Sequence, residues 1–97
     1  MEIKIKSLKF NADQKLIEYV EKKVAKLEKF FDHSGDAEVT LSLLPDPENK
    51  SAKIQIHVPG EDLIIERNAR TFEEAITDAA DAMKEKLTRY KEKLHEA

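Results

Sequence analysis

Two groups of basic side chains are the residues in this sequence whose types and spacing could do chemistry. The first group lies between positions 22 and 29, and the second lies between positions 84 and 93. Ammonium and guanidinium groups gathered on one side of a helix suit the binding of phosphate groups, such as those of a nucleic-acid backbone. The candidate phosphate-binding residues are Lys22, Lys23, Lys26, Lys29, Lys84, Lys86, Arg89, Lys91 and Lys93.

Helical rotation separates the charges of the first group by sign. At about 100° per residue, Lys22, Lys26 and Lys29 fall within an arc of roughly 60°, and the glutamates of the same segment collect on a flank away from them. Most lysine stripes are solvated helix surfaces, and the net charge of −3 argues against a nucleic-acid partner. Binding depends on local potential, however, so the separation of signs keeps phosphate binding as a hypothesis.

Catalysis finds little support in the other side chains. The three histidines, His33, His57 and His95, lie far apart in the sequence. No metalloprotease, nucleophile-elbow, P-loop or dinucleotide-binding motif is present. The chain has no cysteine, which excludes disulfide bonds and thiolate metal sites. We therefore expect no enzymatic activity, no metal, no cofactor and no small-molecule substrate.

The length and the hydropathy pattern predict a single small domain that spans residues 1–97. No apolar stretch approaches the roughly 18 residues of a membrane span. The first ten residues alternate charged and apolar types, which is unlike the apolar run of a signal peptide. We expect no membrane partner.

Apolar periodicity predicts four strands and two helices. Alternation slips at Ser7, which indicates a bulge in the first strand. Asp13 and Thr71 are N-caps for the two helices, and Gly35 is a candidate left-handed cap after the first. The predicted strands cover about residues 2–10, 37–44, 51–58 and 63–69, and the predicted helices cover about residues 13–32 and 72–95.

The predicted fold is of the α+β class, in the order β-α-β-β-β-α. The first two strands enclose a helix, so they should pair in parallel, and the other strands should form an antiparallel meander. Both helices should pack on one face of the four-stranded sheet. Without its first strand, this order is that of a double-stranded-RNA-binding domain.

The last strand has one polar residue, Arg67, among the positions that should face the core. We expect Arg67 to lie at a sheet edge, where its guanidinium group can reach water.

The second helix should bury an apolar stripe. The stripe comprises Phe72, Ile76, Ala80, Met83, Leu87, Tyr90 and Leu94.

Three segments resemble the ribosome hibernation promoting factors, also known as ribosome-associated translation inhibitors. AKLEKFFD at 25–32, preceded by Lys23, is similar to the signature of their first helix. RTFEEAITDAADAMKEKLTRYKEK at 70–93 is similar to their second helix, and VPG at 58–60 matches a turn. The resemblance covers nearly the whole chain and includes the order of the elements.

This resemblance implies a cytoplasmic protein that sits on the small ribosomal subunit and contacts ribosomal RNA and ribosomal proteins. It implies that the protein occludes the channel for messenger and transfer RNA and inhibits translation in slow growth. The chain ends at Ala97, so it resembles the short class. We expect it to be monomeric off the ribosome. The alternative is a small α/β protein-interaction domain with no RNA role, in which the lysines have no ligand.

The resemblance also assigns site residues. Lys23, Lys26 and Lys29 match basic positions of the family's first helix, and the basic residues at 89, 91 and 93 match those of the second. Ala82 and Glu85 stand where many members have lysine and arginine. Lys84 and Lys86 lie one position on either side of Glu85, so they could shift the contact surface around the helix.

Overall fold

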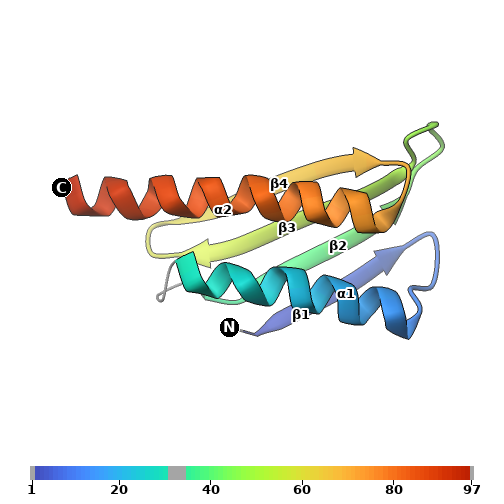
Figure 1. Ribbon diagram of the computed structural model, residues 1–97, viewed down its shortest axis with the longest axis horizontal. Helices are drawn as coiled ribbons and strands as arrows, with labels where there is room; N and C mark the ends of the chain where they lie inside the picture. Colours follow the sequence, from blue (N-terminus) through green and yellow to red (C-terminus); the bar gives the residue numbers. More distant parts are fainter. Residues whose placement is uncertain (1, 31–34, 97) are drawn as a thin grey trace.

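The computed structural model describes residues 2–30 and 35–96. Its elements form two layers, with both helices on one face of a four-stranded sheet (Figure 1). The order confirms the predicted α+β fold. The elements are β1 (Ile3–Leu8), α1 (Gln14–Ala25), the 3₁₀ helix η1 (Lys26–Phe30), β2 (Ala37–Leu43), β3 (Lys50–Val58), β4 (Glu61–Ala69) and α2 (Phe72–Glu96).

The strands lie in the order β1-β2-β3-β4. β1 pairs with β2 in parallel, and β3 pairs with β2 and with β4 in antiparallel fashion. The parallel pair encloses α1, as expected for a crossover connection. α2 packs against β3 and β4, whereas α1 lies over β1 and beside α2 (Figure 1).

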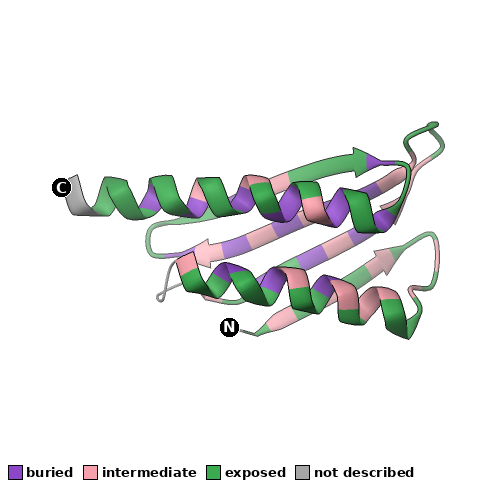
Figure 2. Ribbon diagram, in the orientation of Figure 1, coloured by how far each residue is buried: buried purple, intermediate pink, exposed green. Residues whose placement is uncertain are grey.

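The core lies between the sheet and the helices, where buried residues line the facing sides (Figure 2). Alternate residues of the central strands point toward it, as the period of two requires. Ile54 and Ile56 of β3 are fully buried, as are Ile76, Met83 and Leu87 of α2. The predicted stripe of α2 is therefore confirmed up to Tyr90, but Leu94 is 48% exposed. α2 is long enough that its last turns extend beyond the sheet (Figure 1).

Both predicted N-caps are confirmed. The Leu16 backbone N–H donates to Asp13 Oδ1 over 2.8 Å, and the Glu74 N–H donates to Thr71 Oγ1 over 3.1 Å. Each cap satisfies a backbone donor that a helix start leaves unpaired. The α-helical part of the first helix ends at Ala25 and tightens into η1.

The predicted end of the first helix, near residues 32–35, falls largely outside the described residues. Gly35 itself donates its backbone N–H to the His57 carbonyl over 2.7 Å. A Cβ at this position would lie 3.1 Å from that carbonyl oxygen. Close approach to β3 is thus one physical reason for a glycine here.

The bulge predicted at Ser7 is wrong. β1 keeps continuous register with β2, with Ser7 opposite Leu41 and Leu8 opposite Ser42. Ser7 takes the inward position and Leu8 is 45% exposed. The slip in the pattern comes after the strand, because Lys9 adopts a left-handed backbone with φ of 73°. This turn brings Phe10 back toward the core, where its ring stacks on Phe72 at 4.4 Å.

A tight hairpin joins β3 and β4. Val58 pairs with Glu61, so the connection is Pro59-Gly60 alone, and β4 begins two residues earlier than predicted. Gly60 has a φ of 88°, which suits the second central position of a type II turn. The Tyr90 hydroxyl of α2 donates to the Pro59 carbonyl and fixes the hairpin against the helix.

Arg67 lies on β4 at the edge of the sheet and is exposed, which confirms the prediction for this residue. No helix in the described part of the chain is both long enough and apolar enough to cross a membrane.

Candidate nucleic-acid interface

The first basic group occupies the side of α1 and η1 that faces away from the sheet. Val20 and Val24 are fully buried and Leu27 is nearly so, which fixes the rotation of this segment. Lys22, Lys26 and Lys29 are consequently exposed. Lys23 is half-buried on the flank beside α2, where its ammonium group lies 5.5 Å from the ring centre of Tyr19.

The second basic group divides between two flanks of α2. Lys84 faces α1, and its ammonium group lies 5.0 Å from the ring centre of Phe30. Lys86 lies on the opposite flank, since two residues rotate the helix by about 200°. Its ammonium group donates to the backbone carbonyl of Ile64 in β4 over 3.1 Å.

The three remaining basic residues of α2 are exposed. By helical rotation Lys91 shares the flank of Lys84, whereas Arg89 and Lys93 lie toward the flank of Lys86. Arg89 forms an exposed ion pair with Glu85, with 3.8 Å between Nη2 and Oε1. The predicted site residues of α2 therefore do not form one group.

A groove between the two helices brings both basic groups together. It has a volume of about 280 Å³ and is lined by Lys23, Lys26, Lys29 and Lys84. The groove floor includes the hydrophobic side chains of Leu27, Phe30 and Ala80, together with Asp81 on one wall. We call these four lysines the groove lysines. Cations held over an aromatic and aliphatic floor keep their charged heads available to a phosphate group.

Tyr19 of α1 and Phe30 of η1 are the aromatic side chains nearest to these cations. Both are half-buried and pack against the core cluster. Each ring lies beneath a groove lysine. Both rings therefore belong to the rim of the core and support cations at the groove.

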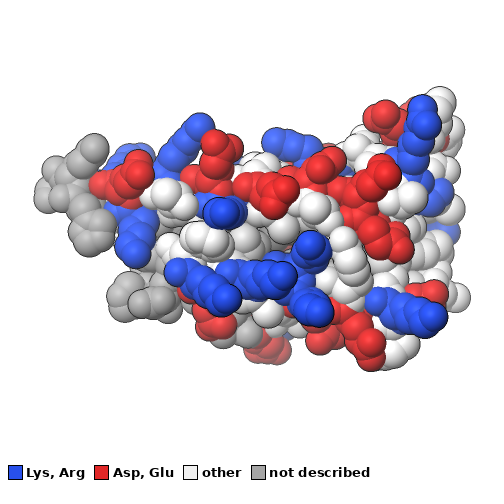
Figure 3. Space-filling view, viewed as in Figure 1, with Lys and Arg blue, Asp and Glu red and all other residues white. Residues whose placement is uncertain are grey.

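The helix face as a whole carries both signs. Figure 3 shows blue side chains over the C-terminal half of α1 and red side chains along the N-terminal half of α2. Asp81 lines the groove itself, and Glu73, Glu74 and Asp78 are exposed farther along α2. The groove lysines thus form one shared patch across the two helices. Arg89, which is paired with Glu85, and Lys86, which donates to a β4 carbonyl, lie outside it.

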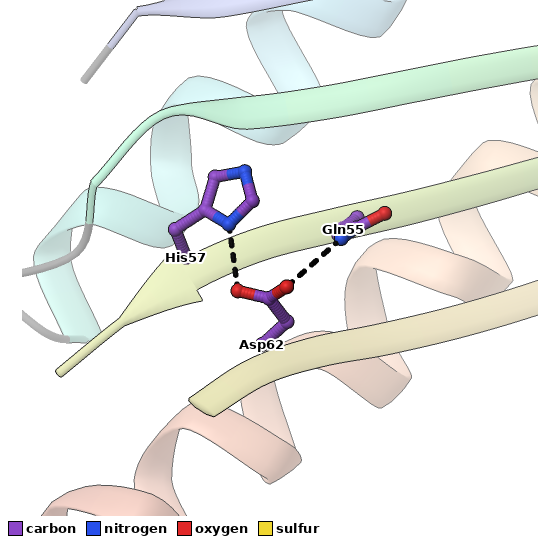
Figure 4. Close-up of polar contacts among 3 residues, drawn as sticks. All are labelled: Gln55, His57 and Asp62. Carbon is purple, nitrogen blue, oxygen red and sulfur yellow. Dashed lines mark hydrogen bonds and ion pairs between the residues drawn. The ribbon is translucent and has the colours of Figure 1, made fainter. Parts of the chain in front are cut away.

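Sequence reasoning missed a polar cluster on the open face of the sheet. His57 Nδ1 lies 2.6 Å from Asp62 Oδ1, and Gln55 Nε2 donates to Asp62 Oδ2 over 3.2 Å (Figure 4). His57 and Asp62 are direct cross-strand partners. A turn limited to Pro59-Gly60 places His57 opposite Asp62. The sequence would have indicated this pair only if that turn had been predicted.

This contact shifts both ionisation equilibria. The hydrogen bond to Asp62, aided by its negative charge, raises the pKa of His57 above its ordinary value. The hydrogen bond from His57 lowers the pKa of Asp62. The two groups are about half-exposed, so the pair links the ends of β3 and β4 on the open sheet face. Among the described residues, no group of three or more histidine or acidic side chains could hold a metal ion.

Comparisons with known proteins agree on one family. The model of the family described as Sigma 54 modulation protein / S30EA ribosomal protein matches residues 3–95. A curated relative, the ribosome hibernation promotion factor of Bacillus subtilis, is 35% identical over 74 residues, which is 76% of this chain. The match spans 38% of that relative's length.

Two solved structures share the fold. The N-terminal domain of Thermus thermophilus Protein Y is 29% identical with a TM-score of 0.81, covering 93% of this chain and 99% of that chain. A ribosomal subunit interface protein from Coxiella burnetii is 15% identical with a TM-score of 0.84. That match covers 94% of this chain and 98% of the other, and at this identity it supports the fold alone.

Proposed function

We propose that this chain, which belongs to the Sigma 54 modulation protein / S30EA ribosomal protein family, is a ribosome-associated hibernation factor. The name of the Bacillus subtilis relative supports this function. The finer proposal is that the chain binds the small ribosomal subunit, occludes the channel for messenger and transfer RNA and inhibits translation in slow growth.

The observation that carries the proposal is the convergence of four lysines from two helices on one groove. Residues 23 and 84 are 61 positions apart in sequence, and only the packing of α1 beside α2 brings them together. Phosphate contacts supply affinity without reading sequence, which suits a factor that must bind every ribosome alike. The ribosomal RNA backbone is the phosphate source that the family supports.

The contact surface is proposed to be the groove lysines with Lys22 and Lys91 beside them. Lys22 is exposed on α1, and Lys91 lies by rotation on the same flank of α2 as Lys84. Arg89, Lys86 and Lys93 lie toward the other flank and take a lesser part in this proposal. The face of the molecule that carries the groove lysines also carries the acidic first half of α2 (Figure 3). These acidic side chains would then lie next to basic ribosomal proteins.

The shape of the molecule supports steric occlusion. Its backbone extends 43 Å along one axis and only 24 and 18 Å along the others. A slim two-layer domain of this shape can lie along an elongated channel and exclude RNA from it. The proposal places the chain in the cytoplasm as a monomer off the ribosome, with no membrane partner and no small-molecule substrate.

Co-sedimentation with purified small ribosomal subunits tests the proposal. If each of the six lysines of this surface makes one phosphate contact, the association constant should fall roughly 10³-fold between 50 and 200 mM salt. A structured messenger RNA bound beforehand should compete with the chain, and translation in a purified system should be inhibited. Binding that ignores salt, or that coexists with a filled channel, would contradict electrostatic docking in the channel.

A further inference from the structure

β4 is an edge strand with one set of peptide groups facing away from the sheet. In the described part of the chain it pairs only with β3. The Pro59-Gly60 turn makes Val58 and Glu61 the first hydrogen-bonded pair, so bonded and non-bonded pairs alternate from there. Residues 62, 64, 66 and 68 therefore direct their N–H and C=O groups outward. Such an edge is a template for pairing with another strand.

Two cations cap consecutive outward carbonyls of this edge. The side chain of Lys86 extends from α2 to this edge of the sheet, and its ammonium group donates to the Ile64 carbonyl over 3.1 Å. The guanidinium group of Arg67 donates to the Glu66 carbonyl over 2.9 Å. A strand that approached this edge would have to displace both hydrogen bonds and pass two positive charges.

We propose that Lys86 and Arg67 hold a latent strand-pairing edge closed, and that the partner fitting this edge is β4 of a second copy of the chain. Charged side chains, lysine above all, are a common device by which proteins keep an edge strand from pairing. Lys86 then protects the monomeric state, a role separate from the lesser part that it takes in phosphate binding. The groove lysines lie on the far side of α2 from it, so the two roles are separate.

One antiparallel register, with the axis at the middle residue of β4, pairs the whole strand with its copy. With Ile65 at the two-fold axis, Ile64 lies opposite Glu66 and Asp62 lies opposite Asn68. All four positions have outward peptide groups, so their hydrogen bonds match. No like charges face each other in this register. Centring the axis on residue 64 places Asp62 opposite Glu66, and centring it on residue 66 places Glu66 opposite itself, which is unfavourable.

The exposed side chains of the edge favour this pairing once the cations are removed. Ile64 is 43% exposed on the open sheet face, and Ile65 is half-buried on the other. Across the two-fold axis the two Ile65 side chains would lie directly opposite each other. An aliphatic pair at the centre of the interface adds apolar contact to the backbone hydrogen bonds.

The first experiment removes the two caps. Sedimentation equilibrium compares the natural chain with the double variant Lys86→Met, Arg67→Met, since methionine keeps an unbranched stem. A matched control, Lys93→Met with Arg70→Met, loses the same charges away from the outward carbonyls of β4. We expect the cap variant to dimerise with a dissociation constant at least about tenfold lower than that of the control or the natural chain. A cap variant that stays as monomeric as the control overturns the proposal.

The second experiment tests the register. The chain has no cysteine, so one introduced thiol can report on pairing without interference. In the cap variant, Ile65→Cys should form a disulfide-linked dimer under mild oxidation, because it lies opposite its own copy. Glu61→Cys lies opposite Ala69 in this register and should remain unlinked. Equal cross-linking of both thiols, or linking of Glu61→Cys alone, overturns β4 pairing as the basis of the dimer.

Discussion

The Tyr19 hydroxyl of α1 lies 3.0 Å from the Thr77 hydroxyl of α2. This hydrogen bond is partly buried and joins the two helices near the groove. The same tyrosine ring lies beneath the ammonium group of Lys23. One side chain thus fixes the spacing of the helices and supports a cation of the proposed interface.

Substitutions at this contact should reveal its energy through a double-mutant cycle. Tyr19→Phe and Thr77→Val each remove one hydroxyl and should each lower the free energy of unfolding by about 1 kcal/mol. The double variant should lose less than the sum, because neither partner is then left unsatisfied. Urea denaturation measures the cycle, and strictly additive losses would show that the two hydroxyls do not interact.

Leu87 and Leu94 of α2 differ in burial, because the first lies in the core and the second lies in the last turns of the helix. Leu87 is fully buried, so Leu87→Ala should lower the free energy of unfolding by about 2–5 kcal/mol through lost burial and a cavity. Leu94 is 48% exposed, and Leu94→Ala should change it by less than about 0.5 kcal/mol. Thermal and urea unfolding of the two variants provide the comparison. Similar losses at both positions would mean that α2 packs along its whole length.

The ion pair of His57 with Asp62 should stabilise the fold only within a window of pH. The pKa of His57 is raised, so its contribution is complete below the unfolded value of about 6.5 and is lost as pH rises through the folded value. The pKa of Asp62 is lowered from 3.8, so its contribution is lost as pH falls through the folded value. The pair therefore contributes most between about pH 4 and 6.5.

The variant His57→Gln checks this window. Its loss of stability relative to the natural chain should be largest near pH 5 and should shrink above the folded pKa of His57. NMR titration of Asp62→Asn should show the pKa of His57 shifted down toward its ordinary value. A loss for His57→Gln that does not vary with pH, or an unchanged pKa in Asp62→Asn, would rule out the pair as its cause.

The fold could be predicted from the sequence because its signals are local. The N-caps at Asp13 and Thr71, the alternation in β3 and the enclosed first helix together limited the topology. The bulge at Ser7 was predicted because the apolar alternation slips there. The slip is caused by a left-handed backbone at Lys9, a conformation that favours glycine, and a lysine at this position does not indicate it. The extension of α2 beyond the sheet depends on the length of the helix relative to the strands that it covers. The apolar periodicity of a helix does not give this relation.

The site could be predicted less well because it depends on tertiary packing. Rotation gives the angle between Lys84 and Lys86 on a helix, but it does not say which flank the other helix covers. Grouping the basic residues of 84–93 by proximity in sequence therefore merged two surfaces. One faces α1 across the groove, and the other reaches the edge of β4.

Binding of paired charge-reversal variants to small ribosomal subunits is the most direct test of the groove as the docking surface. Lys26→Glu with Lys84→Glu reverses two groove lysines, whereas Arg89→Glu with Lys93→Glu makes the same change in charge away from the groove.

Circular dichroism first establishes that both variants are folded. Co-sedimentation at several salt concentrations then gives the association constants. We expect the groove variant to bind at least tenfold more weakly than the control, with a salt dependence reduced by about two phosphate contacts. Equal loss in both variants, or full binding by the groove variant, would contradict it.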